Sequence, residues 1–260
     1  MQVALISSRR LGIALALLLA AFATSRAARA QDWADGRRMD PFVMRANFTL
    51  AHDKVLDDLG TLRNDLTHTL GLPTSDEQVE LYLFADKASY DRYVSARYPG
   101  VPYRRALFVK SGGPGMVYAY RSSDFAVDVR HESTHALLHA VLPSVPLWLD
   151  EGLAEYFEVS PGKRASGHPY MNGLKWSARF GLAPGLATLE SKRELDEMGR
   201  SEYRYSWAWV HFMLHGPEEA RQELRGYLAD LQTNPEPEPL SRRLARRLPR
   251  LEQQFAQHFR

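Results

Sequence analysis

Apolar and polar residues follow two periods along the chain, and these predict a mixed α+β fold. A period of two indicates strands and a period near 3.6 indicates helices. In the first half we expect the strands Met44–Leu50, Val79–Phe84, Ala106–Lys110 and Met116–Tyr120, with the helices Asp53–Leu70 and Lys87–Arg97 among them. The pattern therefore predicts a small mixed sheet in an N-terminal lobe.

The second half has mainly helical periodicity. We expect helices at Leu147–Val159, Tyr205–Leu214 and Glu218–Gln232, with a loop and a short helix over Leu186–Met198. A proline-rich spacer from residue 235 precedes a C-terminal amphipathic helix, whose arginines form an outer face and whose apolar face suits packing onto the domain. We therefore predict one compact domain over residues 31–234, followed by the spacer and helix over residues 235–260.

The N-terminus has the pattern of a secretory signal. Arg9 and Arg10 precede an apolar run from Leu11 to Ala23, and Ala28-Arg29-Ala30 offers small residues for cleavage. The run is short for a bilayer span, although an uncleaved anchor remains an alternative. We expect residues 1–30 to be removed from an exported protein, periplasmic or secreted, with no stable membrane span afterwards.

Composition changes this picture in two ways. The chain has no cysteine, so neither a disulfide nor a lipid anchor on cysteine can form. Removal of the four arginines in the signal changes the formal net charge from +2 to −2. Without a sustained basic face, a nucleic-acid partner is not expected.

A metal-binding pattern starts at His131 in the segment His131-Glu132-Ser133-Thr134-His135. On a helix, residues four apart lie on one face, so both imidazoles can reach one ion. Glu132 is angled beside that ion, where it can act on water as a general base without being a ligand. We expect His139, one turn further, to be a packed or hydrogen-bonded histidine.

A catalytic zinc site needs a third protein ligand, and Glu151 is the best candidate. It lies in Trp148-Leu149-Asp150-Glu151-Gly152, within the helix expected over Leu147–Val159. Glu155 follows one turn later. We expect Glu155 either to accept a hydrogen bond from the outer N–H of a ligating histidine or to be a surface acid.

The two segments together resemble the gluzincin branch of the zincins, the group of thermolysin and aminopeptidase N, and within it the small bacterial peptidase-MA-like domains. The resemblance covers roughly Val127 to Leu214 and implies a zincin-like fold, Zn²⁺ held by His131, His135 and Glu151, and Glu132 as general base. Metzincins are excluded because Leu138 and Val141 replace the glycine and histidine they require.

The resemblance extends to a tyrosine that stabilises an oxyanion and opens a later helix. Matching the small residue Ser206 to the family pattern assigns this role to Tyr203, with Tyr205 and His211 as alternatives. The resemblance also implies that the strand before the active-site helix, Met116–Tyr120, forms a sheet edge for a peptide substrate. Residues 160–184 suit either a segment lining the cleft or a connector.

The sequence thus predicts a zinc metallopeptidase acting on peptides or proteins, with endopeptidase action favoured because no acidic anchor motif for a substrate amine precedes His131. The alternatives are a catalytically silent zinc protein that binds a peptide or cell-envelope partner, and an envelope interaction protein acting through its C-terminal helix.

Overall fold

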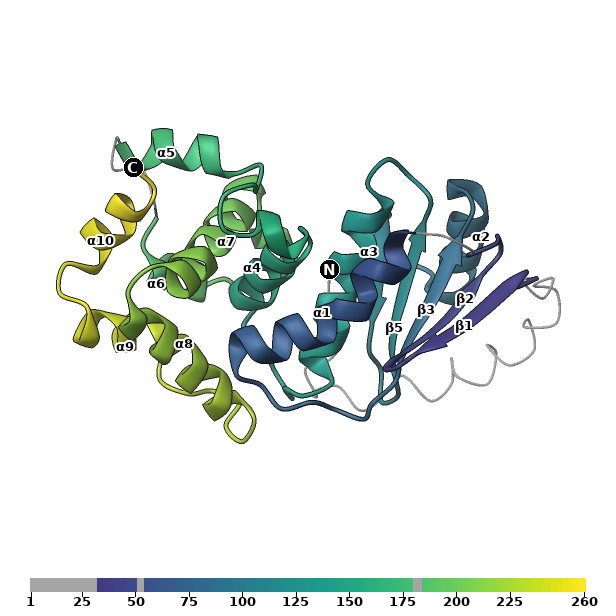
Figure 1. Ribbon diagram of the computed structural model, residues 1–260, viewed down its shortest axis with the longest axis horizontal. Helices are drawn as coiled ribbons and strands as arrows, with labels where there is room; N and C mark the ends of the chain where they lie inside the picture. The colour runs from purple at the N-terminus through teal and green to yellow at the C-terminus, as the bar shows by residue number, and fades with distance from the viewer. Residues whose placement is uncertain (1–31, 51–53, 180–183) are drawn as a thin grey trace.

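The structure is a computed structural model that describes residues 32–50, 54–179 and 184–260. The expected signal, residues 1–30, lies outside these ranges. A five-stranded mixed sheet on the N-terminal side is followed by a mostly helical remainder (Figure 1), which confirms the α+β class predicted by the hydrophobic pattern. Within the described ranges, no helix combines the length and the apolarity that a bilayer crossing requires.

The sheet has the order β1-β2-β3-β5-β4. Strands β2, β3 and β5 are parallel, whereas β1 and β4 run antiparallel to their neighbours at the two ends. The strands are β1 (Asp35–Met39), β2 (Phe42–Ala46), β3 (Val79–Phe84), β4 (Ala106–Val109) and β5 (Gly115–Tyr120).

Two strand predictions need correction at this end of the sheet. The strand expected over Met44–Leu50 is Phe42–Ala46, and the Leu50 N–H instead donates to the Asp35 carboxylate at 2.8 Å. Strand β1 was not predicted, because Asp-Gly-Arg-Arg-Met has no apolar alternation. A strand paired on only one side, with its central residues exposed, does not need that alternation.

The predicted sheet edge is also wrong. Strand β5, expected to be the edge, lies between β3 and β4, so β4 is the terminal strand on the side of α3 (Phe125–His139). Strand order depends on which of the two strands pairs with β3, and here that strand is β5. Tertiary packing decides this pairing, and the alternation of apolar residues carries no information on it.

Helices cover both faces of the sheet. Helices α1 (Lys54–Leu70) and α3 lie on one face, and α2 (Lys87–Arg97) packs against β3 and β5 on the other. Ala106 and Phe108 of β4 belong to the core on the α1 and α3 side, whereas Leu107 and Val109 belong to the core on the α2 side. Because both faces are covered, successive β4 side chains are all apolar.

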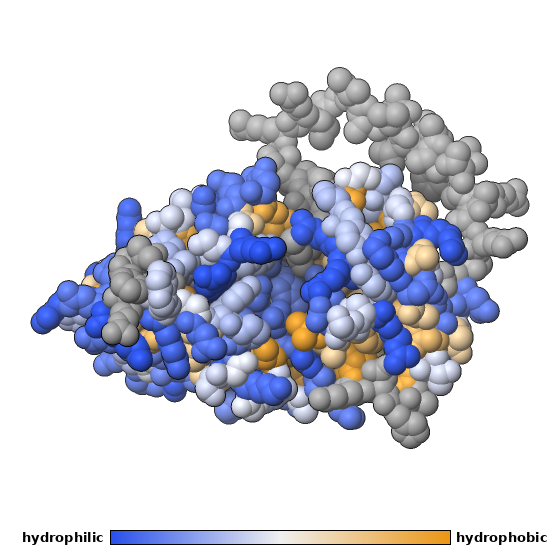
Figure 2. Space-filling view, turned by 90° about the horizontal axis from the view of Figure 1, so that it is seen from above, coloured by the Kyte–Doolittle hydropathy of each residue, from blue (hydrophilic) through white to orange (hydrophobic). Residues whose placement is uncertain are grey.

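The helical remainder lies beside the sheet layer and to its left in Figure 1. It consists of α4 (Leu147–Phe157), η1 (Pro161–Lys163), α5 (Met171–Arg179), α6 (Leu186–Glu190), η2 (Leu195–Glu197), α7 (Arg200–His215), α8 (Glu218–Leu231), α9 (Leu240–Arg247) and α10 (Leu251–His258). On the face shown in Figure 2, hydrophilic residues cover most of this half, while apolar residues gather more on the sheet-bearing side.

Helix α7 starts five residues before the predicted Tyr205. Its first turn is polar, so it falls outside the apolar pattern, but Glu202 accepts a hydrogen bond from the Gly199 N–H at 2.9 Å and caps the helix start. Tyr203 therefore lies in the first turn of α7.

Helices α4 and α7 approach each other closely at Gly152. A Cβ atom at this position would lie 2.7 Å from the Ser206 carbonyl oxygen. Glycine is thus required there by the contact between the helix that carries Glu151 and the helix that carries Tyr203.

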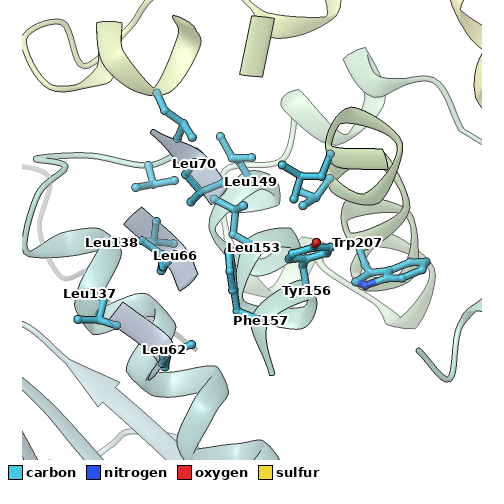
Figure 3. Packing of buried hydrophobic residues seen from close by; sticks show 14 of the residues in the cluster. Leu62, Leu66, Leu70, Leu137, Leu138, Leu149, Leu153, Tyr156, Phe157 and Trp207 are labelled. Atoms are coloured by element: carbon cyan, nitrogen blue, oxygen red, sulfur yellow. The ribbon is translucent and has the colours of Figure 1, made fainter. Parts of the chain in front are cut away.

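A continuous apolar core joins the two parts of the molecule. Leucines of α1 lie opposite leucines of α3 and apolar residues of α4 (Figure 3). The residues labelled there are Leu62, Leu66, Leu70, Leu137, Leu138, Leu149, Leu153, Tyr156, Phe157 and Trp207. This core holds α3 and α4 beside each other, so groups on the two helices keep a fixed separation.

The C-terminal amphipathic helix is two helices rather than one. Helix α9 ends before Leu248, because a residue preceding proline is driven out of the helical region, and Arg250 adopts a left-handed conformation with φ 57°. The apolar residues predicted to pack are buried, namely Leu240, Leu244, Leu248, Leu251 and Phe255. Packing onto the rest of the protein is confirmed for this segment.

Candidate metal centre

Helix α3 presents His131 and His135 one turn apart on the same side. Their rings lie 5.0 Å apart in an edge-to-face arrangement. His135 is fully buried, and its ring stacks on Phe108 of β4. The sheet therefore fixes the orientation of the second imidazole.

Glu151 of α4 meets both imidazoles. Its Oε2 atom lies 3.5 Å from His131 Nε2 and 3.7 Å from His135 Nε2. The three predicted ligand atoms all lie within 4.8 Å of one another. The structure thus brings His131, His135 and Glu151 together from two helices.

These residues fit a divalent ion. In a tetrahedral site with bonds of about 2.0–2.1 Å, two ligand atoms are separated by about 3.3 Å, close to the distances from Glu151 to each histidine. The buried His135 Nε2 and both Glu151 carboxylate oxygens have no hydrogen-bond partner among the described residues. Buried polar atoms without partners are costly, and a cation would satisfy all three.

The outer nitrogens of the two histidines face acids other than the predicted Glu155. His131 Nδ1 lies within hydrogen-bond distance, 3.0 Å, of Glu158 Oε2, and His135 Nδ1 lies 3.0 Å from Asp150 Oδ1. The role expected for Glu155 is therefore filled by Glu158 at His131, and Asp150 is the carboxylate in contact with the outer nitrogen of His135. A carboxylate at the outer nitrogen favours the tautomer whose other nitrogen is free to bind a metal.

Asp150 also holds His139, as expected of a packed histidine. Its second carboxylate oxygen is 3.1 Å from His139 Nε2, and the His139 ring stacks on Phe108. Burial by itself would raise the pKa of Asp150, but His135 and His139 outweigh it and hold that pKa well below its usual range. Asp150 is consequently a buried carboxylate that stays charged.

A cleft of about 530 Å³ opens beside these groups. Glu132 and Tyr203 both line it, together with His131 and Glu151. Burial, and next the nearby Glu151, raise the pKa of Tyr203 above its usual range, so its hydroxyl remains protonated and can donate a hydrogen bond. Both residues predicted to act on substrate thus border the same space as the candidate ligands.

The alternatives to Tyr203 lie elsewhere. His211 Nε2 is 3.0 Å from the Ala165 carbonyl oxygen, and its Nδ1 is 2.8 Å from His258 Nε2. Neither His211 nor the buried Tyr205 lines the cleft. Of the three candidates, Tyr203 is the one next to the ligand cluster.

A second group of acids borders His131. Glu155, Glu158 and His131 also bring ligand atoms within 4.8 Å of one another. Burial, and next the neighbouring Glu158, raise the pKa of Glu155, whose Oε1 accepts a hydrogen bond from Tyr170 at 3.3 Å. Because His131 Nε2 faces Glu151, its Nδ1 remains for Glu158, and both Glu155 and Glu158 line the same cleft as Glu151.

His168 lies beside these two acids. The Tyr170 N–H donates to His168 Nδ1 at 3.2 Å, so in the neutral ring the proton is on Nε2, which lies 3.7 Å from Glu158 Oε1 and 3.8 Å from Glu155 Oε2. Sequence reasoning missed Asp150, Glu158 and His168. It anticipated that residues 160–184 could line the cleft, and Tyr170 does so.

No protein-family model matches the chain, and no curated protein matches it. The function must therefore be argued from the residues and their geometry.

Proposed function

We propose that the protein is a zinc-dependent metallopeptidase of the gluzincin type with a zincin-like fold. The observation that carries this proposal is the convergence of His131 Nε2, His135 Nε2 and Glu151 Oε2 at the side of a cleft that Glu132 also lines. A two-histidine, one-carboxylate set suits zinc and leaves room for a further ligand, which is typical of a catalytic site rather than a structural one.

Zn²⁺ in this site would supply a Lewis acid for the scissile carbonyl and lower the pKa of a coordinated water. Glu132 acts as the general base that takes the proton of the attacking water and passes it to the leaving amine. Tyr203 donates its hydroxyl proton in a hydrogen bond to the carbonyl oxygen as negative charge develops there. Asp150 and Glu158 keep the two imidazoles in the ligating orientation.

The substrate in this proposal is a peptide or protein segment in extended form. Strand β4 is the terminal strand of the sheet, and the residues at its start, Arg105 and Ala106, line the cleft. An extended peptide can pair with such a strand through its backbone, whatever its side chains are. This arrangement suits endopeptidase action.

Replacing Glu132 by Gln tests the proposal. The Glu132→Gln variant is expected to keep its zinc and lose about 10²–10⁴ in kcat on a peptide library, since an amide cannot accept the proton. Glu219→Gln, on the exposed surface of α8, is the matched control and should cleave like wild type. If the zinc-loaded wild type cleaved no peptide, or if both variants cleaved equally, the peptidase proposal would be wrong.

Tyr203→Phe against Tyr205→Phe tests the second catalytic assignment. Loss of one donor to an oxyanion lowers kcat by about 10²–10³, and this loss is expected for Tyr203→Phe alone. Equal kinetics for the two variants would remove Tyr203 from the mechanism.

A catalytically silent zinc protein that binds a peptide or cell-envelope partner is the second candidate function. A binding site has no use for a base, so Glu132 beside the ligand cluster favours the enzyme. Zinc retention with no cleavage by wild type would favour the binding protein.

We also propose that the protein is exported and acts in the periplasm or outside the cell, because residues 1–30 have the pattern of a cleaved signal. Expression with the native N-terminus followed by N-terminal sequencing should find Gln31 first. An intact N-terminus in the cytoplasm would contradict export.

A further inference from the structure

A second pocket lies on the opposite face of the sheet from the candidate metal centre. It has a volume of about 250 Å³ and is formed by α2 and the segment that leads into β4. Its apolar lining consists of Tyr90, Val94, Val101, Pro102 and Leu107.

The pocket adjoins the metal cleft. Tyr103 and Arg104, in the segment that leads into β4, line both the pocket and the cleft. A ligand that follows β4 through the cleft therefore lies next to residues that also line the second pocket.

Successive side chains of β4 line the two spaces in turn. Ala106 lines the metal cleft and belongs to the core on the α3 side, whereas Leu107 lines the second pocket and belongs to the core on the α2 side. In a paired strand, directly opposite residues point to the same face of the sheet. A peptide residue opposite Leu107 would thus point toward the second pocket.

Two of the charged residues at the pocket, Lys87 and Asp91, form an ion pair with each other. Lys87 pairs with Asp91 at 2.5 Å and lies over the Tyr103 ring at 4.0 Å from its centroid. Because these two opposite charges neutralise each other, neither offers an unpaired charge to a ligand, and the lining beneath them is apolar.

We propose that this pocket is a specificity subsite that receives a large apolar side chain, of the Leu, Met or Phe class, from the peptide substrate. This inference rests on the proposed peptidase function and deepens it. The substrate residue that the pocket recognises is the one paired opposite Leu107. The adjacent substrate residue faces the metal cleft. Cleavage sites should therefore share an apolar residue at one fixed position.

Filling the pocket tests this inference. Val94 is half-buried, so Val94→Trp can occupy the space, while Ala96→Trp adds the same group on an exposed position of α2 that does not line the pocket. Cleavage sites would be mapped by mass spectrometry with a peptide library. Then kcat/KM would be measured for two matched peptides that carry Leu or Ala at the preferred position.

We expect Val94→Trp to lower kcat/KM for the Leu peptide by about 10–200-fold and to leave the Ala peptide nearly unchanged, because the lost apolar contact acts on one side chain alone. Ala96→Trp should behave like wild type with both peptides. Val94→Ala, which enlarges the pocket, should shift the preference toward Trp and Tyr, and it keeps the inference testable if the Trp variant does not fold.

Two results would overturn the subsite, and they differ from each other. Glu132-dependent cleavage without an apolar preference, or an equal loss for both peptides in Val94→Trp, would reject the pocket and leave the peptidase intact. Absence of any Glu132-dependent cleavage would reject the peptidase and the subsite together.

Discussion

Two histidine clusters in this protein have different partners. On α3, the outer nitrogens of His131 and His135 face the carboxylates of Glu158 and Asp150, and their inner nitrogens converge on Glu151. On α7, both nitrogens of His211 are occupied by a backbone carbonyl and by His258.

The difference lies in the charge of those partners. Carboxylates at the outer nitrogens keep the inner nitrogens of His131 and His135 available to a cation. The His211 cluster has no such help: burial, opposed by the Ala165 carbonyl and reinforced by His215 and His258, lowers the pKa of His211 to about 3. A neutral ring that uses both nitrogens within the protein ties α7 to α10 (Leu251–His258) and has no nitrogen left for a metal.

The largest expected effect separates the clusters by metal affinity. His135→Gln should weaken zinc binding by more than about 100-fold, because it removes a proposed metal ligand and not merely a residue that orients a ligand. His211→Gln, the matched change in the other cluster, should leave zinc affinity within about threefold. Competition with a chromophoric chelator measures both, and comparable losses would show that the distinction between the clusters is wrong.

The next effect concerns the carboxylates behind the ligands. Asp150→Asn and Glu158→Gln should each weaken zinc binding by about 10–100-fold, because the amide loses the negative charge and keeps only one acceptor oxygen where the carboxylate has two. Glu155→Gln is the control in the same wall of the cleft, and its zinc affinity should change little. A larger effect at Glu155 than at Glu158 would restore the assignment made from sequence.

A smaller effect is expected at the contact between the helices that carry the two regions. Gly152→Ala would place a Cβ atom 2.7 Å from the Ser206 carbonyl oxygen, so α4 and α7 must separate, at a cost of about 1–3 kcal/mol of unfolding free energy. Thermal unfolding should occur several degrees lower. Gly162→Ala, whose Cβ would meet open space, should unfold like wild type.

The smallest effect is the pH dependence of the His211 cluster. The folded pKa of about 3 lies below the ordinary value of 6.5, so the neutral ring stabilises the fold fully above pH 6.5, and this stability is lost as pH falls toward 3. Between pH 6.5 and 5 the loss is about 1–2 kcal/mol. Denaturant unfolding in excess chelator should show a flatter pH profile for His211→Gln than for wild type, and parallel profiles would contradict the assignment.

The sequence predicted that His131, His135 and Glu151 would lie together, and the structure brings these three side chains together. His131 and His135 are one helical turn apart, and Glu151 lies in a helix whose apolar periodicity is clear. Which carboxylates lie next to the histidines depends on how α3 packs against α4. The periodicity of the sequence carries no information on that packing. Glu155 was expected from its position one turn after Glu151, yet the crossing brings Glu158, nearly two turns after Glu151, to His131.

The fold was also predictable in part from the sequence. Strands with apolar alternation and helices with an apolar face were found, whereas the polar strand β1 (Asp35–Met39) was not. The position of β4 (Ala106–Val109) at the end of the sheet is a matter of strand order, which is set by tertiary packing. The division of the C-terminal helix at Pro249 was not predicted either, because the apolar period continues across it.

The most direct test of the central claim is a crystal structure of the zinc-loaded protein with anomalous scattering measured at the zinc edge. We predict one strong peak bonded at about 2.0–2.2 Å to His131 Nε2, His135 Nε2 and a Glu151 carboxylate oxygen. A peak at another set of residues, or zinc binding that leaves Glu151 uncoordinated, would contradict the account.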